Sequence, residues 1–436
     1  MKVLKINNFS KFHLLNNIDY KNYSYSELTN LYIENGWCFF SGLNDFLNRH
    51  RINVIDIFFN EKNIQIKWMH ENFSFKEKQI NQIGSWKYNV NKLQDILNTI
   101  LIHQIKKEKP DIIFLTPGAA YTLDKDILTF AKNSFDTKIL LHWGDELWPN
   151  VLYKNFFYNI DYAFSTNKLY YEKFKDAGIE NSIVPNYFES PYSKEEILNK
   201  SKNKEFQITF CGSSGQNLTD HNYRFEFLNK ASLSTDLKIF THVENLNDIK
   251  FKKLIVKTLK KLPPPINKFL FSTIFRRYQF LKEIINIHKF LNLSDINESY
   301  LQLKQWDKKI DRIFEPKQTI KDYLDLIISS RMVLNIHRDE LADYGNIRCF
   351  EAVGHNSLLV TDKKNLLKEF FDVENDIFAF QTYDEFLEKY KYFTLNPKEA
   401  EKISLNAFNK AWKSFSTNEC YQIIYEKIIE LKSQLK

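Results

Sequence analysis

The sequence predicts an α/β protein with two Rossmann-like domains, each built on a parallel sheet, and three observations lead to this prediction. A chain of 436 residues is too long for one ordinary hydrophobic core. Short apolar runs alternate with helical patterns, which is typical of parallel sheets covered by helices. Residues 187–205 are mostly polar or charged and contain Pro191, so we expect a linker there. The expected domains span residues 1–186 and 206–400, followed by a helix over 401–436.

The composition excludes several classes of protein. A hydrophobic content of 43%, with only 10 glycines and 10 prolines, indicates a folded globular chain. The first ten residues lack the apolar core of a secretory signal, and no apolar run approaches the length of a membrane span. The four cysteines have neither metal nor redox spacing, so we expect reduced thiols in a cytoplasmic protein.

The first half opens with a strand, a helix and a second strand, the beginning expected of a parallel sheet. No glycine-rich dinucleotide fingerprint follows the first strand, so an NAD-binding interpretation has no support. Apolar runs predict strands over residues 1–6, 52–59, 110–117, 138–143, 161–166 and 182–186. Helical periodicity predicts helices over residues 25–48, 90–106, 124–133 and 167–177.

The strand at 138–143 brings polar residues to the sheet edge where ligands gather. His142 lies at its carboxyl end, and the loop that follows holds Asp145 and Glu146. An imidazole or a carboxylate at that edge is able to take a proton from an acceptor. These three residues are therefore the candidates for a catalytic base.

The second half opens with an apolar strand that ends in a Gly/Ser turn, formed by Gly212, Ser213 and Ser214. Such a turn lets backbone N–H groups approach a phosphate or a sugar without a side-chain clash. Arg224 follows at the start of the next helix. The alternative is an ordinary strand-to-helix turn followed by a solvated arginine. Further strands are expected over 237–242, 332–336, 357–361 and 377–382, and helices over 318–331, 346–355, 365–371, 383–393 and about 400–436.

A basic insertion at 248–292 interrupts this alternation. From Asp248 to Lys289 there are eleven Lys or Arg residues, while Asp248 and Glu283 are the acidic ones, and the apolar residues recur at helical spacing. A basic amphipathic helix pair suits an in-plane anchor on anionic lipid, with an attraction of roughly 1 kcal/mol per nearby cation. The alternative is a helical hairpin that packs on its own domain. Nucleic-acid binding is a poorer interpretation, because no recognisable nucleic-acid module surrounds the insertion.

Residues 346–362 form the most informative stretch. The strand at 332–336 leads into a polar loop that begins with His337 and Arg338, and a helix follows. Asn346 is a good N-cap, and Arg348 in the first turn is unfavourable against the helix dipole unless an anion is present. Glu351 lies on the same face as Arg348. A cation for phosphates and a carboxylate for paired hydroxyls suit a nucleotide diphosphate attached to ribose, although a plain surface pair between Arg348 and Glu351 is the alternative.

This stretch, NIRCFEA and then a strand ending in Thr-Asp, resembles the donor-site helix of GT-B glycosyltransferases, in particular the CgeB-like family. The matching residues are Asn346, Arg348, Phe350, Glu351, Thr361 and Asp362. The resemblance covers most of the chain outside the insertion. One departure is that Asn356 stands where the family usually has a helix-ending glycine; because asparagine adopts the left-handed conformation most readily after glycine, we expect the turn to survive.

The resemblance implies a GT-B fold: two Rossmann-like domains facing a cleft, a helical basic insertion in the second, and a C-terminal helix that crosses back. It implies metal-independent transfer of a sugar, without a cofactor, from a nucleotide sugar on the second domain to a glycan, lipid-linked glycan or protein acceptor on the first. Glu351 would hold the ribose. The expected donor-binding residues are Gly212, Ser213, Ser214, Arg224, His337, Arg338, Asn346, Arg348 and Glu351.

Several alternatives stay open at the level of sequence. The chain is either an inverting enzyme, which needs a base, or a retaining one, which does not. A non-catalytic GT-B-like module that binds a nucleotide or glycan and is tethered to a membrane is the competing function. A nucleotide-sugar epimerase is disfavoured, because the first domain shows no cluster of acid/base residues. The expected location is cytoplasmic, with attachment to the inner face of the membrane if residues 248–289 bind lipid.

Overall fold

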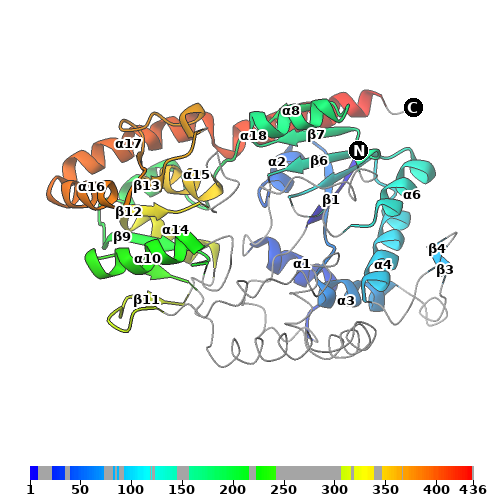
Figure 1. Cartoon of the computed structure of the whole chain (residues 1–436). Helices are drawn as coiled ribbons and strands as arrows, with labels where there is room; N and C mark the ends of the chain where they lie inside the picture. Colours follow the sequence, from blue (N-terminus) through cyan, green and yellow to red (C-terminus); the bar gives the residue numbers. More distant parts are fainter. Residues whose placement is uncertain are drawn as a thin grey trace, which may run out of the picture.

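The computed structural model shows two domains side by side (Figure 1). It describes residues 1–7, 22–34, 40–72, 82–83, 86–87, 93–117, 119, 123–144, 157–215, 222–241, 306–315, 319–337, 346–365 and 367–434. Within these residues each domain has a six-stranded sheet whose neighbouring strands all run parallel. The prediction of an α/β fold with two Rossmann-like domains is confirmed. The basic insertion expected at 248–292 lies outside the described residues.

The sheet of the first domain has the strand order β2-β1-β5-β6-β7-β8. Its strands are β1 (Lys2–Asn7), β2 (Asn53–Phe58), β5 (Ile112–Leu115), β6 (Lys138–Trp143), β7 (Tyr162–Ser165) and β8 (Asn181–Ile183). The helices are α1 (Tyr25–Glu34), α2 (Leu43–Arg49), α3 (Lys62–Asn72), α4 (Leu93–Glu108), α6 (Lys125–Phe135) and α8 (Lys168–Asp176). A two-stranded antiparallel pair, β3 (Gln82–Ile83) and β4 (Trp86–Lys87), lies outside the sheet.

Two features of this domain differ from the sequence-based expectation. The helix expected over 25–48 is two helices, α1 and α2, and Phe40 between them has a left-handed φ of 60°. A left-handed residue cannot continue a right-handed helix, so the helical pattern is broken there. Helix α3 was not expected, because Ile64, Gln65 and Trp68 are its buried residues and they make a weak apolar pattern.

A buried ion pair joins β2, the edge strand of the first sheet, to its neighbour β1. Lys5 on β1 and Asp56 on β2 are 0% and 1% exposed at their side chains, and their charged atoms are 3.0 Å apart. Lys5 Nζ also donates to the backbone carbonyl of Phe40 at 2.7 Å. Asn7 Nδ2 donates to Asp56 Oδ1 at 2.6 Å, and Asn44 donates to the other carboxylate oxygen. These hydrogen bonds and the ion pair tie β1, β2 and the start of α2 together.

The sheet of the second domain has the strand order β11-β10-β9-β12-β13-β14. Its strands are β9 (Phe206–Cys211), β10 (Lys238–Phe240), β11 (Ile313–Phe314), β12 (Ser330–Asn335), β13 (Leu358–Asp362) and β14 (Phe378–Phe380). The helices are α10 (Asn222–Ser234), α14 (Ile320–Ile328), α15 (Ile347–Gly354), α16 (Tyr383–Leu395) and α17 (Pro397–Ser414), with a short 3-10 helix η8 (Leu367–Glu369) where a helix was expected over 365–371.

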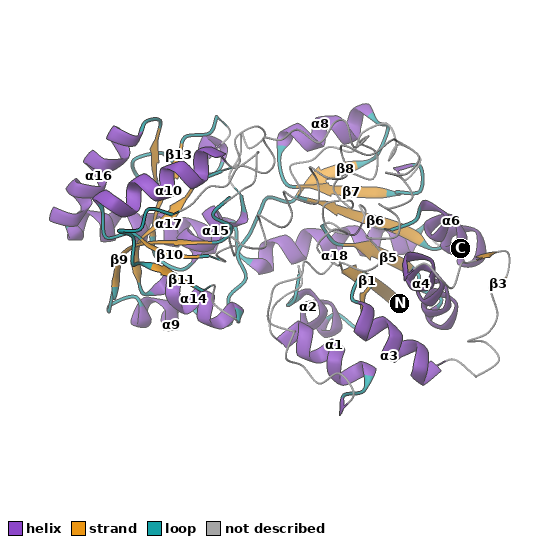
Figure 2. Ribbon diagram, turned by 60° about the horizontal axis from the view of Figure 1, so that its bottom comes forward, coloured by secondary structure: helices purple, strands orange, loops and turns teal. Residues whose placement is uncertain are grey.

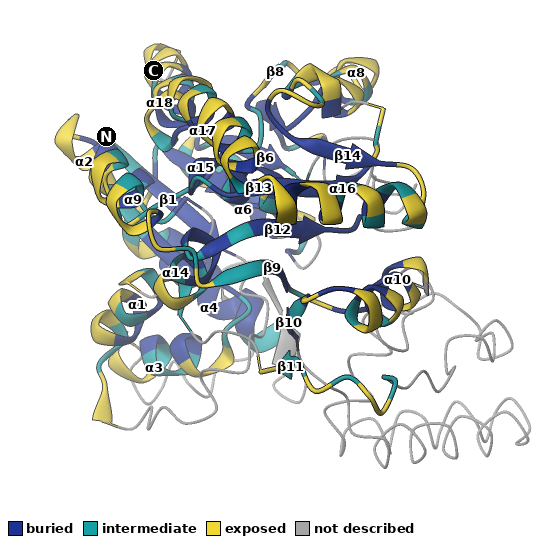
Figure 3. Ribbon diagram, turned by 90° about the vertical axis from the view of Figure 1, so that its left-hand side faces the viewer, coloured by how far each residue is buried: buried dark blue, intermediate teal, exposed yellow. Residues whose placement is uncertain are grey.

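Helices cover both faces of the second sheet. Residues of α10 and α16, such as Leu228 and Phe386, share one core with strand residues such as Leu334. Residues of α14, α15 and α17 form the core on the other face together with Val333 and Leu359. Strands buried on both faces have continuous apolar sequences, which is why the sequence predicted them well. Figure 3 shows β13 and β14 buried, β9 partly intermediate, and the outer faces of the helices exposed.

The C-terminal part crosses from the second domain to the first, as expected. It is two helices, however, α17 and α18 (Thr417–Ser433), where one helix was expected over about 400–436. Helix α17 packs in the core of the second domain, whereas Tyr421, Ile424 and Ile428 of α18 lie in the core of the first. The break at 415–416 redirects the chain between these two cores, and Figure 2 shows α18 beneath the strands of the first domain.

Residues 187–205, expected as a linker, connect the domains and also contain a helix, α9 (Lys194–Lys200). Ser193 and Glu196 form a capping box at its start, and Ile197 is fully buried. Before it, Tyr187 contributes to the core of the first domain, and the adjacent Phe188 contributes to that of the second. An ideal Cβ on Gly354 would lie 2.3 Å from Phe188 Cγ, so the phenyl ring rests directly on this glycine.

Within the part of the chain that the structure describes, no helix is both long enough and apolar enough to cross a membrane.

Candidate functional site

The strand order of the second sheet reverses between β9 and β12. The chain winds from β9 outward through β10 and β11, then returns to β12 on the other side of β9. At such a reversal the loops after the two central strands diverge, and their carboxyl ends form a crevice for a ligand. Gly212 follows β9, and His337 lies two residues after β12. Both were predicted from the sequence as donor-binding residues.

Gly212 and Arg348, which are far apart in the sequence, meet at this reversal. Gly212 has a φ of 137°, in the range that favours glycine, and an ideal Cβ there would lie 2.4 Å from Arg348 Nη2. The guanidinium of Arg348 therefore lies directly against the backbone of the Gly/Ser turn. A side chain at position 212 would displace it.

Arg348 is half-buried as a residue, and its guanidinium contacts the protein. Arg348 Nη1 donates to Asn335 Oδ1 at 3.2 Å, and the guanidinium carbon lies 5.7 Å from the centroid of the Phe210 ring. Its Nε is buried and has no hydrogen-bond partner among the described residues. Although burial alone would lower the pKa of Arg348, the neighbouring Tyr323 and Glu351 raise it. The arginine is thus a fixed cation with hydrogen-bonding capacity left over.

Glu351 lies one helical turn after Arg348 and is also partly exposed. Tyr323 Oη on α14 donates to Glu351 Oε2 at 2.6 Å. Burial raises the pKa of Glu351, while the hydrogen bond from Tyr323 and the charge of Arg348 oppose that rise. Among the described residues Tyr323 is the one hydrogen-bond partner of this carboxylate, and the bond reaches Oε2 alone. Among the described residues Arg348 and Glu351 form no direct ion pair. The structure therefore does not show the alternative, a plain surface pair between them.

The sequence predicted how both ends of α15 are formed, with Asn346 as the N-cap and Asn356 in the closing turn. Asn346 is the N-cap residue, but its side chain does not cap the helix; Asn346 Nδ2 instead donates to Asn335 Oδ1 at 3.1 Å. Asn335 Oδ1 accepts hydrogen bonds from both Asn346 and Arg348, so the Asn346 amide bonds Asn335 and not the first turn of the helix. At the other end, Asn356 has a left-handed φ of 56°, which confirms that asparagine supports the turn in place of glycine.

A second polar cluster lies beside this arginine, at the ends of β12 and β13. The buried ring of His337 hydrogen-bonds through Nδ1 to Asp362 Oδ1 at 2.7 Å, and the same oxygen accepts from the His337 backbone at 2.9 Å. Burial alone would raise the pKa of Asp362, but His337 and the cation of Lys364 lower it to about 2. Asn335 links the clusters, because its Nδ2 lies 3.3 Å from His337 Nε2.

A cavity of about 270 Å³ opens next to His337 and Asp362. Its lining also includes two adjacent lysines, Lys363 and Lys364, which directly follow β13. The other lining residues are Tyr223, Phe380 and Gln381. Sequence reasoning missed these lysines, although their position at the carboxyl end of a predicted strand was a usable signal.

Cys349, His337 and Asp362 have the connectivity of a nucleophilic triad, with Cys349 Sγ 3.8 Å from His337 Nε2. The cysteine is fully buried, and burial raises the pKa of its thiol. A protonated and inaccessible thiol is not a nucleophile. The cluster is therefore structural, as expected of cysteines without redox or metal spacing.

The remaining predicted donor-site residues differ in burial, and one of them lies outside the described residues. Arg224 is buried and donates through Nε to Ile336 O at 2.9 Å and through Nη1 to Ser213 O at 3.1 Å. It ties the loops after β9 and β12 to each other, so it is not a solvated arginine. Ser214 is buried, and its backbone N–H bonds Thr241, while Ser213 is exposed. Arg338 lies outside the described residues.

The three candidates for a catalytic base lie in the first domain. Asp145 and Glu146 lie outside the described residues. His142, at the carboxyl end of β6, is 3% exposed and packs edge-on against Phe40 with ring centroids 4.7 Å apart. Both of its ring nitrogens are buried without a hydrogen-bond partner among the described residues. Burial lowers the pKa of His142 to about 3, so the imidazole is neutral at pH 7 and is a weak base.

Comparisons with known proteins agree with this fold. Residues 276–425, which contain α14 to α17, match the family model described as glycosyl transferase-like. The structure of sucrose-phosphate synthase from Thermosynechococcus elongatus superposes with a TM-score of 0.56 at 10% identity, covering 100% of both chains. The fold is GT-B.

Two other GT-B structures match over nearly the whole chain. That of HepE from Anabaena in complex with UDP-glucose has a TM-score of 0.51 at 13% identity, covering 99% of this chain and 100% of that one. That of an alpha-glucosyltransferase in complex with UDP-glucose and DNA containing an abasic site has a TM-score of 0.50 at 11% identity, covering 98% and 99%. No curated protein sequence matches this chain significantly.

The buried histidines of this GT-B chain are expected to make it acid-sensitive. Burial lowers the pKa of His142 to about 3 and that of His355 to about 4, whereas an unfolded histidine takes up its proton near pH 6.5. Below that pH the unfolded chain binds protons that the folded chain does not. Each histidine should therefore cost about 2 kcal/mol of stability between neutral pH and about pH 5.

Urea unfolding at both pH values measures this loss. His355→Gln should remove about half of the difference, whereas His70→Gln, at an exposed position, should leave it unchanged. Equal stability of the wild-type chain at the two pH values would contradict the neutral, buried state of these rings.

Proposed function

We propose that this protein is a glycosyltransferase that transfers a sugar from a nucleotide-sugar donor, and that it is of the CgeB-like kind. The proposal rests on one observation, the contact between the Arg348 guanidinium and the Gly212 backbone. This contact lies at the reversal between β9 and β12, beside the amino end of α15. An exposed helix amino end and a fixed arginine form an anion site. The similar proteins HepE and alpha-glucosyltransferase are described in complex with UDP-glucose, which supports a UDP-sugar as the first donor to try.

In this proposal Arg348 and the first turn of α15 hold the diphosphate and stabilise its charge as the sugar–phosphate bond breaks. Fixed donors aimed at developing charge usually make the greatest contribution to catalysis. Glu351 accepts hydrogen bonds from the ribose hydroxyls through the oxygen that Tyr323 leaves open. Lys363 and Lys364 add positive charge at the neighbouring cavity. Asn335 and Arg224 act as positioning residues, because they hold Arg348 and the Gly/Ser turn in place.

Replacing Gly212 tests this arrangement without removing a charged group. Gly212→Ala must displace the Arg348 guanidinium, so the affinity for UDP should fall by about tenfold or more. Gly178→Ala is the matched control, since Gly178 also has a positive φ, 75°, but a Cβ there meets nothing within 4 Å. Titration calorimetry with UDP measures both. Unchanged affinity in folded Gly212→Ala would argue against diphosphate binding at Arg348.

We also propose that transfer needs no divalent metal, because Arg348 and the helix dipole supply the positive charge. Turnover should be the same in EDTA as in added Mg²⁺ or Mn²⁺. Loss of turnover in EDTA, restored by metal, would overturn this part.

The acceptor is proposed to bind the first domain, with Asp145 or Glu146 as the base if the reaction inverts the anomeric centre; His142 is buried and weakly basic and does not suit this role. Of Asp145→Ala and Glu146→Ala, the one that removes the base should then lower turnover more than it lowers acceptor affinity. If Asp145→Ala leaves turnover intact while Glu351→Ala abolishes it, Asp145 is not the base. Product analysis by NMR distinguishes inversion from retention, and only inversion calls for such a residue.

A lipid-linked glycan or polysaccharide precursor is the acceptor that the sequence of the basic insertion favours, with the enzyme at the cytoplasmic face of a membrane. This part rests on the residue pattern at 248–289 alone. Deleting that stretch should release the protein from anionic liposomes while UDP binding remains. Retention of the deletion variant on liposomes would reject it.

Thermal shift with a panel of UDP-, GDP-, CMP- and dTDP-sugars tests the proposed donor class, since a ligand of the native state raises its melting temperature. A donor that binds should also be hydrolysed slowly or transferred to an acceptor extract. Binding without any turnover would instead favour a non-catalytic GT-B module.

A further inference from the structure

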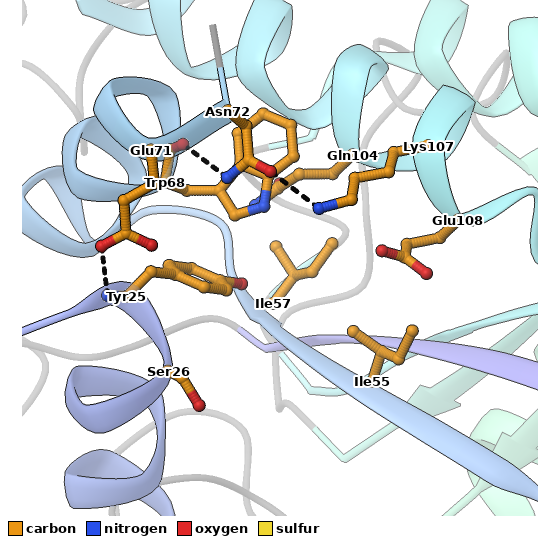
Figure 4. Close-up of a pocket in the computed structure, with 10 residues that line it drawn as sticks. All are labelled: Tyr25, Ser26, Ile55, Ile57, Trp68, Glu71, Asn72, Gln104, Lys107 and Glu108. Atoms are coloured by element: carbon orange, nitrogen blue, oxygen red, sulfur yellow. Dashed lines mark hydrogen bonds between the residues drawn. The ribbon is translucent and has the colours of Figure 1, made fainter.

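A second cavity lies entirely within the first domain, away from the candidate donor site. It has a volume of about 310 Å³, at the lower end of ligand pockets, and α1, α3, α4 and β2 supply its lining (Figure 4). Lys2, at the start of β1, pairs with Glu108 in the lining at 3.0 Å. The cavity therefore lies toward the amino ends of the strands, whereas His142 lies at a carboxyl end. No part of the proposed function uses it.

Gln104 on α4 is the feature that points to a ligand. Its side chain lines the cavity and the residue is 2% exposed, yet neither its amide nitrogen nor its amide oxygen has a hydrogen-bond partner among the described residues. Buried amides are nearly always hydrogen-bonded, because an unmet one costs the desolvation of both its atoms. A ligand that offers both a donor and an acceptor would satisfy this glutamine once its buried amide turns toward the cavity.

The other lining groups define what kind of ligand fits. Trp68 and Tyr25 supply aromatic surface, and Glu71 and Asn72 supply polar atoms at the ends of the side chains shown in Figure 4. Asn72 Oδ1 accepts from Lys107 Nζ at 2.7 Å, and Glu71 Oε1 accepts from the Tyr25 backbone at 2.8 Å. Aromatic faces combined with amides and carboxylates suit a molecule with apolar faces and a rim of hydroxyl groups.

The charges of the lining argue against an ionic ligand. Two carboxylates, Glu71 and Glu108, outnumber the one ammonium of Lys107, so an anion such as phosphate is disfavoured. A cation is disfavoured because Glu108 already pairs with Lys2, and Lys107 lies 5.9 Å over the Trp68 ring, where an organic cation would bind. We propose that this cavity is a saccharide-binding site for a neutral sugar unit, separate from the donor site.

The proposal stands on the cavity alone and does not need the chain to be a transferase. Full-length protein is titrated with maltotriose, cellotriose, mannotriose and chitotriose, with inorganic phosphate and choline as ionic probes. Saturation-transfer NMR detects binding and calorimetry measures affinity. At least one trisaccharide should bind at millimolar concentration, and Arg348→Ala should bind it equally well.

Gln104→Met removes the amide and keeps the length of the side chain. It should weaken saccharide binding by about tenfold or more, since two hydrogen bonds are lost. The melting temperature should stay the same or rise, because an unpaired buried amide is gone. A purely structural glutamine would instead lower it. Gln422→Met, at an exposed position on α18, is the matched control and should change neither quantity.

Glu71→Ala provides a second variant at an exposed lining residue, where misfolding is no concern, and it should also weaken binding. Three results would overturn the proposal: no trisaccharide binds, Gln104→Met and Glu71→Ala bind like wild type, or Arg348→Ala abolishes the binding. Binding of choline or phosphate in place of sugars would overturn the assigned ligand class.

Discussion

Arg348→Ala is expected to lower donor turnover by about 100-fold or more, the largest functional effect of any single change in this chain. The guanidinium is fixed between Asn335 and the Gly212 backbone, and its Nε has no partner among the described residues. In the proposed reaction it faces the leaving diphosphate, where charge develops as the glycosidic bond breaks. Alanine removes the charge and both hydrogen-bonding edges of the guanidinium.

The rate of donor hydrolysis or transfer measures this loss, with whichever nucleotide sugar raises the melting temperature of the wild type. Arg348→Lys keeps the charge but not the planar fork, so it should recover only part of the rate. Arg331→Ala removes an arginine that pairs with Glu401 at the opposite end of β12, and its rate should match the wild type. A folded Arg348→Ala variant with normal turnover would exclude Arg348 from the site.

Asp56→Ala is expected to destabilise the chain by about 3–5 kcal/mol, the largest effect on stability. The substitution leaves the Lys5 ammonium, which is fully buried, without its counter-charge 3.0 Å away. It also takes the hydrogen-bond acceptor from Asn7 and Asn44. Removing one member of a buried pair costs far more than the pair itself contributes, because a charge remains in a medium that solvates it poorly.

Urea unfolding of the variants measures this cost. Lys200→Ala breaks an exposed pair with Asp325 and should cost less than about 1 kcal/mol. The double variant Lys5→Met with Asp56→Ala should be more stable than Asp56→Ala alone, since no lone charge is left. If Asp56→Ala costs no more than Lys200→Ala, the buried pair is not a stabilising contact of the first sheet.

Much of the fold was predictable because its strands are buried on both faces. Residues 112–115 and 358–360, for example, are continuous apolar runs, and the structure forms β5 and β13 there. The break in the C-terminal helix was missed, since the helical pattern runs on through Phe415 and Ser416. The spacing of Ser416 and Glu419 was a usable start signal for α18, although the Ser416 side chain makes no capping bond.

The candidate site was predictable in its residues but not in their contacts. Gly212 and Arg348 each stood out from the sequence, yet their contact depends on a positive φ and on the sheet order. Asn335 and Tyr323 did not stand out, because their partners Arg348 and Glu351 lie 13 and 28 residues away. Short motifs reveal neighbours within one helix or loop, whereas these contacts arise only after the parallel strands align.

The most direct measurement is a crystal structure of the chain with UDP bound. It should show the diphosphate within hydrogen-bonding distance of Arg348 and the first turn of α15, with the ribose hydroxyls on Glu351. Clear density for UDP at any other place, with Arg348 still on Gly212 and free of the phosphates, would contradict the proposed donor site and with it the proposed transferase.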